Sequence, residues 1–357
     1  MNRFRFPLFL TAFAFCASLP TLVTAATYVP AVKTETIVGG LDNPVAVAMR
    51  ASGGDLFVSE SGAGRVVRIT PGKDAKPQPA ITGFPVGPSP EIAELRVGPL
   101  GLAFTAAGQL IVGSGGQGPE KDAVRLFILP ADNKPQTIDD AKKVLTIKPG
   151  KEPTDSKTGE GWFYGVVAPP YAIFATSRGE ASSGWISRSF IQPALGKGPE
   201  TLRDLRPFIE SKRLVNVDGP TALVISKRGE LVVSQAGKFD KTPDSQLSFY
   251  NPSNAKLLLN MPTGLLDIVG LAYSPKTGLL YAVDLAWADD KQGGLFRLDA
   301  TQTDGMMGVK AVKITSLDRP TSLCFAPDGT LYVTTLGATK PGAPEKPGQL
   351  LKITGSL

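Results

Sequence analysis

Carboxylate side chains recur at one position of a repeated segment, and carboxylates are well suited to bind a metal ion. Six segments each open with a short turn before an apolar stretch. Five of the six carry an acid at the same place in that turn: Asp42, Glu160, Asp218, Asp267 and Asp318. Acids that lie close together need a cation, a proton or basic partners. Oxygen ligands suit Ca²⁺ or Mg²⁺, so the pattern predicts a cation site. Alternatively, each acid is an ordinary turn residue that accepts hydrogen bonds from nearby backbone amides.

A second set of polar side chains follows the next apolar stretch of each segment. Its candidates for binding a ligand are Glu60, Gln117, Arg178, Gln235, Asp284 and Trp287. Trp287 is expected to stack on a flat ligand, or else to pack beneath its own loop. Arg178 is expected to bind a carboxylate, or else to pair with Glu180. We expect both sets on one face of the molecule, where loops carry binding residues.

Missing residue types exclude several chemistries. The chain contains no histidine, which rules out Ser-His-Asp and Cys-His catalysis and HExxH zinc sites. A Gly-x-Ser-x-Gly motif is absent. The glycine-rich run at 113–118 lacks the Lys-Ser/Thr pair of a phosphate-binding loop. No residue is therefore predicted to be catalytic.

The repeat predicts the elements that position these side chains. The first copy has a polar turn and apolar stretch at 42–48, a second stretch after a glycine at 54–58, and a third at 65–69. Further copies start near residues 98, 161, 219, 268 and 319, and the first near 43. The third is degraded, with Ala168-Pro169-Pro170 in place of its glycine turn. Because each copy is too small to bury its own faces, radial packing into a six-bladed β-propeller is predicted.

The chain ends predict how the ring closes. A β-like stretch at 32–38 precedes the first copy, and the sixth copy ends on a third strand at 348–353. We expect the early strand to be the outermost strand of the last blade. One all-β domain is then predicted over residues 28–355. A helical solenoid is excluded because the copies show no 3.6-residue period.

Residues 41–48, followed by 55–62, carry a family resemblance. They resemble the repeats of NHL and TolB-like six-bladed propellers, a group that includes gluconolactonase and strictosidine-synthase-like proteins. The first and last repeats are also similar to bacterial exported propellers of the ScyD/ScyE type. The resemblance spans nearly the whole mature chain, but its motifs mark the fold and not an activity.

The amino terminus predicts export. Arg3 and Arg5 precede an uncharged apolar run, and small residues follow at 23–26, which together describe a signal peptide over residues 1–26. A secreted or periplasmic location is expected. Elsewhere no apolar run approaches the roughly 20 residues that cross a bilayer. The net charge of +6 comes from residues spread along the chain, so no nucleic-acid partner is predicted. Cys324 would be the only cysteine of the mature chain, and we expect it to be a buried small hydrophobe.

Two functions follow from these patterns. The first is an exported, non-catalytic binding scaffold, expected to be a monomer, which holds a small molecule or a protein through its channel-mouth loops. The second is implied by the resemblance to gluconolactonase: a divalent-metal hydrolase, with Glu60, Asp218 and Asp267 as ligands. A condensing activity of the strictosidine-synthase type has no discriminating residue in this chain.

Overall fold

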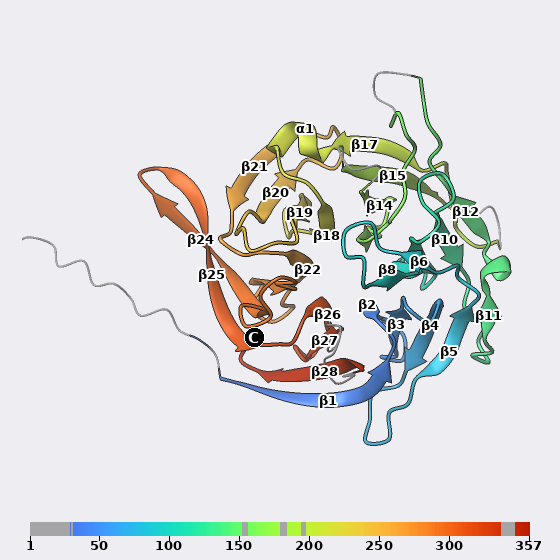
Figure 1. Cartoon of the computed structure of the whole chain (residues 1–357). Helices are drawn as coiled ribbons and strands as arrows, with labels where there is room; N and C mark the ends of the chain where they lie inside the picture. Colours follow the sequence, from blue (N-terminus) through green and yellow to red (C-terminus); the bar gives the residue numbers. More distant parts are fainter. Residues whose placement is uncertain (1–28, 30, 152–155, 179–183, 194–197, 337–346) are drawn as a thin grey trace, which may run out of the picture.

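Six antiparallel sheets stand around a central axis in the computed structural model, so the chain forms the predicted six-bladed β-propeller (Figure 1). The structure describes residue 29 and residues 31–151, 156–178, 184–193, 198–336 and 347–357. The predicted signal peptide and Glu180 lie outside these residues. No helix in the described part is long and apolar enough to cross a membrane.

The first two blades follow the repeat closely. The first runs outward through β2 (Pro44–Met49), β3 (Leu56–Glu60), β4 (Arg65–Ile69) and β5 (Gln78–Thr82). The second contains β8 (Pro99–Phe104), β9 (Leu110–Ser114), β10 (Val124–Phe127) and β12 (Lys143–Leu145). Between the blades lies a small hairpin of β6 (Gly87–Pro88) and β7 (Arg96–Val97). The short β11 (Gln136–Thr137) pairs in parallel with β5, and a 3-10 turn follows at Ile138–Asp140.

The next three blades carry the middle of the chain. The third contains β13 (Val166–Val167), β14 (Ala172–Ser177), β15 (Trp185–Gln192), β16 (Thr201–Leu202) and β17 (Arg206–Glu210). After the short helix α1 (Ser211–Val215), the fourth contains β18 (Pro220–Ile225), β19 (Leu231–Gln235), β20 (Gln246–Tyr250) and β21 (Leu257–Pro262). The fifth contains β22 (Ile268–Tyr273), β23 (Leu280–Asp284), β24 (Gly294–Thr303) and β25 (Met306–Ser316).

The third blade departs from its predicted start near residue 161. Its innermost strand begins only at Val166, because Phe163 bonds to the second blade instead: its N–H donates to Ser114 and its carbonyl accepts from Gly101. The strand also ends early, since Pro169 and Pro170 have no N–H to donate to a ladder. At Gly165 the backbone passes so close to Thr221 that a Cβ would collide with its carbonyl oxygen.

The two ends of the chain complete the sixth blade. It contains β26 (Pro320–Phe325), β27 (Leu331–Thr335), β28 (Gly348–Gly355) and, on the outside, β1 (Val32–Leu41). Strand β1 pairs antiparallel with β28 from Val32 opposite Gly355 to Leu41 opposite Gly348. The prediction that the amino-terminal strand closes the ring is confirmed.

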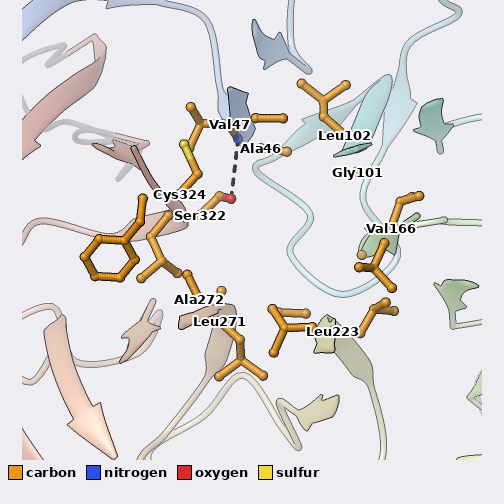
Figure 2. A pocket seen from close by; sticks show the side chains of 18 of the residues that line it. Ala46, Val47, Gly101, Leu102, Val166, Leu223, Leu271, Ala272, Ser322 and Cys324 are labelled. Carbon is orange, nitrogen blue, oxygen red and sulfur yellow. Dashed lines mark hydrogen bonds between the residues drawn. The ribbon is translucent and has the colours of Figure 1, made fainter. Parts of the chain in front are cut away.

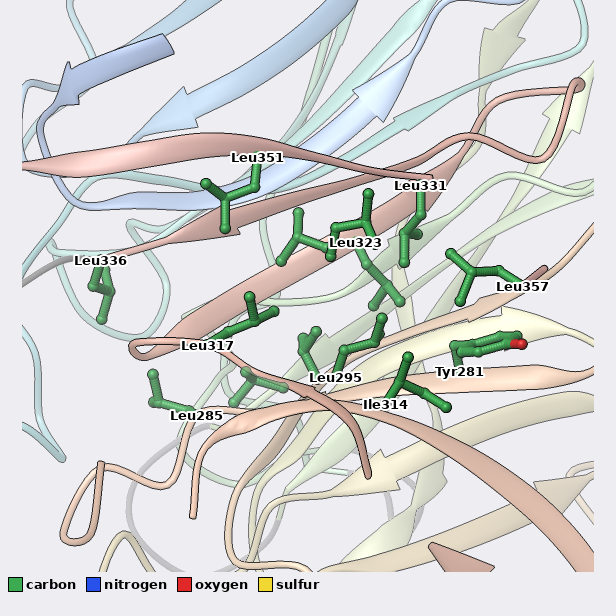
Figure 3. Packing of buried hydrophobic residues seen from close by; sticks show 14 of the residues in the cluster. Tyr281, Leu285, Leu295, Ile314, Leu317, Leu323, Leu331, Leu336, Leu351 and Leu357 are labelled. Carbon is green, nitrogen blue, oxygen red and sulfur yellow. The ribbon is translucent and has the colours of Figure 1, made fainter. Parts of the chain in front are cut away.

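Neighbouring blades are held together by apolar side chains and, near the axis, by hydroxyl groups. Figure 3 shows the apolar layer between the fifth and sixth blades, where Leu295, Leu323 and Leu331 interdigitate. Four buried hydroxyls each donate to a carbonyl on the innermost strand of the next blade: Ser59 to Leu100 (2.8 Å), Thr176 to Thr221 (2.7 Å), Thr221 to Ile268 (2.6 Å) and Thr321 to Pro44 (2.7 Å). We call these four groups the hydroxyl belt. Because the hydroxyl belt is buried, removing one of its hydroxyls would leave the carbonyl that it serves without a hydrogen-bond partner.

Candidate functional site

The two predicted sets of polar residues lie near the same end of the blades. The first residue of a blade's innermost strand faces the last residue of its second strand. Five blades show this register: Pro44 opposite Glu60, Pro99 opposite Ser114, Pro220 opposite Gln235, Ile268 opposite Asp284, and Pro320 opposite Thr335. In the first and fifth blades the acid of the second strand accepts the backbone N–H of the turn acid.

The fifth blade shows this pairing most completely. The buried carboxylate of Asp284 accepts three backbone N–H groups, from Leu266 (3.0 Å), Asp267 (2.7 Å) and Ala286 (3.2 Å). Asp267 is fully buried, and its Oδ2 accepts the N–H of Trp287 at 2.7 Å. Its Oδ1 finds no hydrogen-bond partner among the described residues. Burial raises the pKa of Asp267 to about 8, helped by the neighbouring charge of Asp284. At neutral pH the Asp267 carboxyl therefore carries a proton.

The buried acids of the first and third blades also serve their own turns. Glu60 accepts the N–H of Asp42 at 3.0 Å and pairs with Arg65, the Nε–Oε2 distance being 2.5 Å. Glu160 accepts the hydroxyls of Ser156 (2.6 Å) and Ser177 (2.5 Å), while burial raises its pKa. Both glutamates are fully buried.

The remaining predicted residues are spread over several environments. Asp42, Asp318 and Gln117 are exposed, and Asp218 pairs with Lys212 at 2.5 Å. Gln235 is fully buried, and both atoms of its amide lack a partner among the described residues. Trp287 lies beneath Arg319, whose guanidinium carbon is 4.3 Å from the indole ring centre. Arg319 belongs to the turn that opens the sixth blade, so this contact joins Trp287 to a neighbouring blade and not to its own loop.

The five turn acids do not assemble into a cation site in the described part of the chain. No three Asp, Glu or Cys side chains there lie close enough together to hold a metal ion. Glu160 and Asp267 are engaged by local donors, Asp218 has a lysine partner, and Asp42 and Asp318 face solvent. The residues present therefore do not fit the Ca²⁺ ring that their spacing suggested.

The mouth of the channel on this face is filled by the loop of the β6–β7 hairpin. Ile92, only 5% exposed, packs into one cluster with Val269 and Leu285 of the fifth blade. What stays hollow beneath the loop is a cavity of about 70 Å³. The sequence patterns missed this plug; its one signal is a pair of apolar residues, Ile92 and Leu95, within a proline-rich polar stretch.

The axis of the propeller is open from the other end. A cavity of about 800 Å³ is lined by the innermost strands and by the turns at their carboxyl ends, such as residues 168–170 and 326–327. Its walls contain no Asp, Glu, Lys or Arg. Figure 2 shows aliphatic side chains around it, including Leu102, Val166, Leu223 and Leu271. This cavity was not predicted from the sequence. Small residues in these strands, such as Ala46, Gly101 and Ala272, leave the space open and were the available signal.

Cys324 lies on the wall of this axial cavity. Burial raises the pKa of its thiol to about 12, so the reactive thiolate is scarce at neutral pH. The side chain has the apolar surroundings expected of a small hydrophobe, but it is half-buried at the cavity wall and not fully buried.

Comparison with known proteins adds evidence about the fold. No family model and no curated protein matches the chain. Among solved structures, it is similar to the PQQ-bound aldose sugar dehydrogenase of Streptomyces coelicolor, with a TM-score of 0.59 and 16% identity over 91% of this chain and 98% of that one. A gluconolactonase of Xanthomonas campestris gives 0.56 and 13% over 91% and 90%. A luciferin-regenerating enzyme gives 0.55 and 12% over 91% and 95%. The chain is thus a six-bladed propeller with gluconolactonases and aldose sugar dehydrogenases among its structural neighbours.

Proposed function

We propose that the protein is a non-catalytic binding propeller that holds an uncharged, largely apolar small molecule in its axial cavity. The observation that carries this proposal is the cavity itself: about 800 Å³ with no charged side chain in its walls. Ligand sites of small molecules usually measure about 300–1,000 Å³ and are mostly apolar. The sequence patterns pointed to the mouth loops, whereas the binding site proposed here lies at the open end of the axis.

The walls select against charged ligands. A charged group brought into this cavity would lose its hydration without meeting an opposite charge. An apolar surface instead gains about 25 cal/mol for each Å² removed from water. Two hydroxyl groups of the wall already have partners: Thr321 donates to Pro44, and Ser322 accepts the N–H of Val47 at 3.4 Å (Figure 2).

Fluorescence titration with N-phenyl-1-naphthylamine, an uncharged apolar dye, tests the proposal on the mature protein. We expect saturable binding that Ala272→Glu weakens by about ten-fold or more, because the new carboxylate would be desolvated by the ligand. Leu258→Glu is the matched control, since Leu258 is 46% exposed on the outer strand β21. Equal affinity for the dye in both variants and the wild type would refute the axial site.

A divalent-metal hydrolase of the lactonase type is the second candidate, and the fold likeness to gluconolactonases favours it. Of its three suggested ligands, Glu60 is paired with Arg65, Asp218 with Lys212, and Asp267 retains one oxygen without a partner. Hydrolysis of gluconolactone that is lost on chelation and in Asp218→Ala would support it. Calcium titration calorimetry with a flat trace at millimolar Ca²⁺ would argue against it.

The proposal also covers the location of the protein and its relation to other propellers. We infer a secreted or periplasmic location from residues 1–26, and an affinity with NHL or ScyD/ScyE-type propellers from the repeats. Fractionation of cells expressing the full chain tests export: the mature form should appear outside the cytoplasm, with its new amino terminus near residue 26.

A further inference from the structure

A largely buried arginine at the channel mouth is neutralised by the hairpin that plugs it. Arg178 follows strand β14 of the third blade, and its side chain is 12% exposed. Its guanidinium pairs with Glu91 at 2.9 Å, and Glu91 belongs to the β6–β7 loop between the first and second blades. Burial lowers the pKa of Arg178, which shows how far this cation is removed from water. The counter-charge for Arg178 therefore comes from an inserted loop.

The walls around Arg178 are shaped by other blades. Phe239 lies under the guanidinium, with its ring centre 5.1 Å from the central carbon of that group. A Cβ at Gly219 would lie 2.6 Å from a guanidinium nitrogen, so only glycine lets the backbone pass there. Trp162 and Tyr164 line the same small hollow. These groups form a recess for an anion that is built from blades three and four.

Backbone geometry marks the same mouth. The turns that open the first, fourth and sixth blades hold a left-handed residue: Asn43 (φ 45°), Gly219 (φ 71°) and Arg319 (φ 48°). In the third blade Trp162 takes this conformation at φ 48°, which is unfavourable for a large side chain. Its indole Nε1 is buried without an acceptor among the described residues. The mouth therefore holds a buried donor, the Trp162 Nε1–H, that no described residue accepts.

We propose that the channel mouth is a second ligand site, for a carboxylate attached to a small apolar group, and that Glu91 and Ile92 occupy it as an internal substitute. Glu91 supplies the carboxylate on Arg178, and its neighbour Ile92 supplies the apolar group against Val269 and Leu285. The Glu91 side chain is 31% exposed, so the recess lies within reach of solvent. This site lies at the opposite end of the axis from the proposed binding cavity, and the two share wall residues such as Tyr164 and Val269.

The charges nearby favour a monoanion. Asp218 of the fourth blade acts on Arg178 as a second negative charge beside Glu91. A single carboxylate replaces Glu91 charge for charge, whereas a doubly charged phosphate would add a repulsion that the present arrangement lacks. Arginine also matches the planar geometry of a carboxylate.

Isothermal titration calorimetry with hexanoate tests the second site. We expect Glu91→Ala/Ile92→Ala to bind hexanoate about ten-fold more tightly than the wild type, because the internal competitor is gone. Adding Arg178→Gln should remove that gain, and 1-hexanol, which lacks the charge, should gain clearly less than hexanoate does. Glu94→Ala, an exposed acid of the same loop, is the matched control and should behave as the wild type.

Two results would overturn the proposal: hexanoate affinity that is unchanged in the double variant, or a gain that survives Arg178→Gln. If circular dichroism shows that the double variant is unfolded, Glu91→Gln replaces it in the same comparison, with the same signs expected. Naphthylamine binding in the axial cavity is measured on each variant. Its persistence separates a failure at the mouth from a failure of the proposed function.

Discussion

Replacing Asp267 by asparagine should make the stability of this propeller less dependent on pH. Asp267 is fully buried, and only its Oδ2 has a hydrogen bond, from the N–H of Trp287. Asparagine retains that acceptor and places an amide nitrogen where the unpartnered oxygen lies. The substitution therefore removes a titrating group while it keeps the shape and the bond of the turn.

The sign follows from the direction of the pKa change. The folded-state pKa of Asp267 is about 8, above its ordinary value of 3.8, so the folded protein binds this proton more tightly than the unfolded chain does. The resulting stability is fully present below about pH 4 and is lost as the pH rises toward about 8. At 1.36 kcal/mol per pKa unit, the loss has a ceiling on the order of 5 kcal/mol. Water that enters the turn once the group ionises reduces the measured value, so we expect about 2–3 kcal/mol.

Urea unfolding between about pH 4 and pH 9 measures this difference. Asp267→Asn should match the wild type at the acid end and exceed it by about 2–3 kcal/mol at the alkaline end. Asp318→Asn is the control, because Asp318 opens the sixth blade with an exposed side chain. A constant difference between Asp267→Asn and the wild type across the whole range would refute a buried, protonated Asp267.

Three further perturbations test the ring and its turns. Thr321→Val should lower the free energy of unfolding by about 1–3 kcal/mol, since the carbonyl of Pro44 loses its buried donor; chemical denaturation measures it, and an unchanged midpoint would count against the hydroxyl belt. Glu60→Gln should lower the free energy of unfolding by about 1–3 kcal/mol, because the buried acceptor loses its charge opposite Arg65. Thermal melts measure this loss, and an unchanged melting temperature would show that the pair contributes nothing. A chain that begins after Leu41 lacks β1 and should lose its cooperative unfolding transition; a cooperative melt of that chain would show that the ring does not need this strand.

The ring of blades was predictable because its causes are local and repeated. Alternating apolar residues and fixed turn spacing determine the strands of each blade. The extra stretch at 32–38 pairs with β28, which would otherwise be the edge strand of the last blade. The third blade was less predictable for a physical reason. Its first strand begins late because Phe163 bonds to the second blade, a contact that no pattern within the copy encodes.

The site was less predictable because the partners of its acids come from distant positions. The repeat assigned Asp267 and Asp284 to two sets on one face, but sequence spacing did not reveal that backbone N–H groups would occupy Asp284. Nor did it show that the Ile92 loop folds back over the axis and packs on the fifth blade. A turn acid fits both a ring of metal ligands and a ring of ordinary turns, and the hydrogen-bond partners distinguish the two.

The closed mouth and the open axis together explain why fold likeness is a weak guide to chemistry here. A propeller can present charged side chains to a substrate only where they remain free after its turns are satisfied. In this chain Glu60, Glu160 and Asp284 satisfy turns or local partners, and Glu91 covers Arg178. The wall of the axial cavity, in contrast, carries no charged side chain. The ligand proposed for that wall would be recognised by burial and shape, because burial of apolar area needs no charged partner.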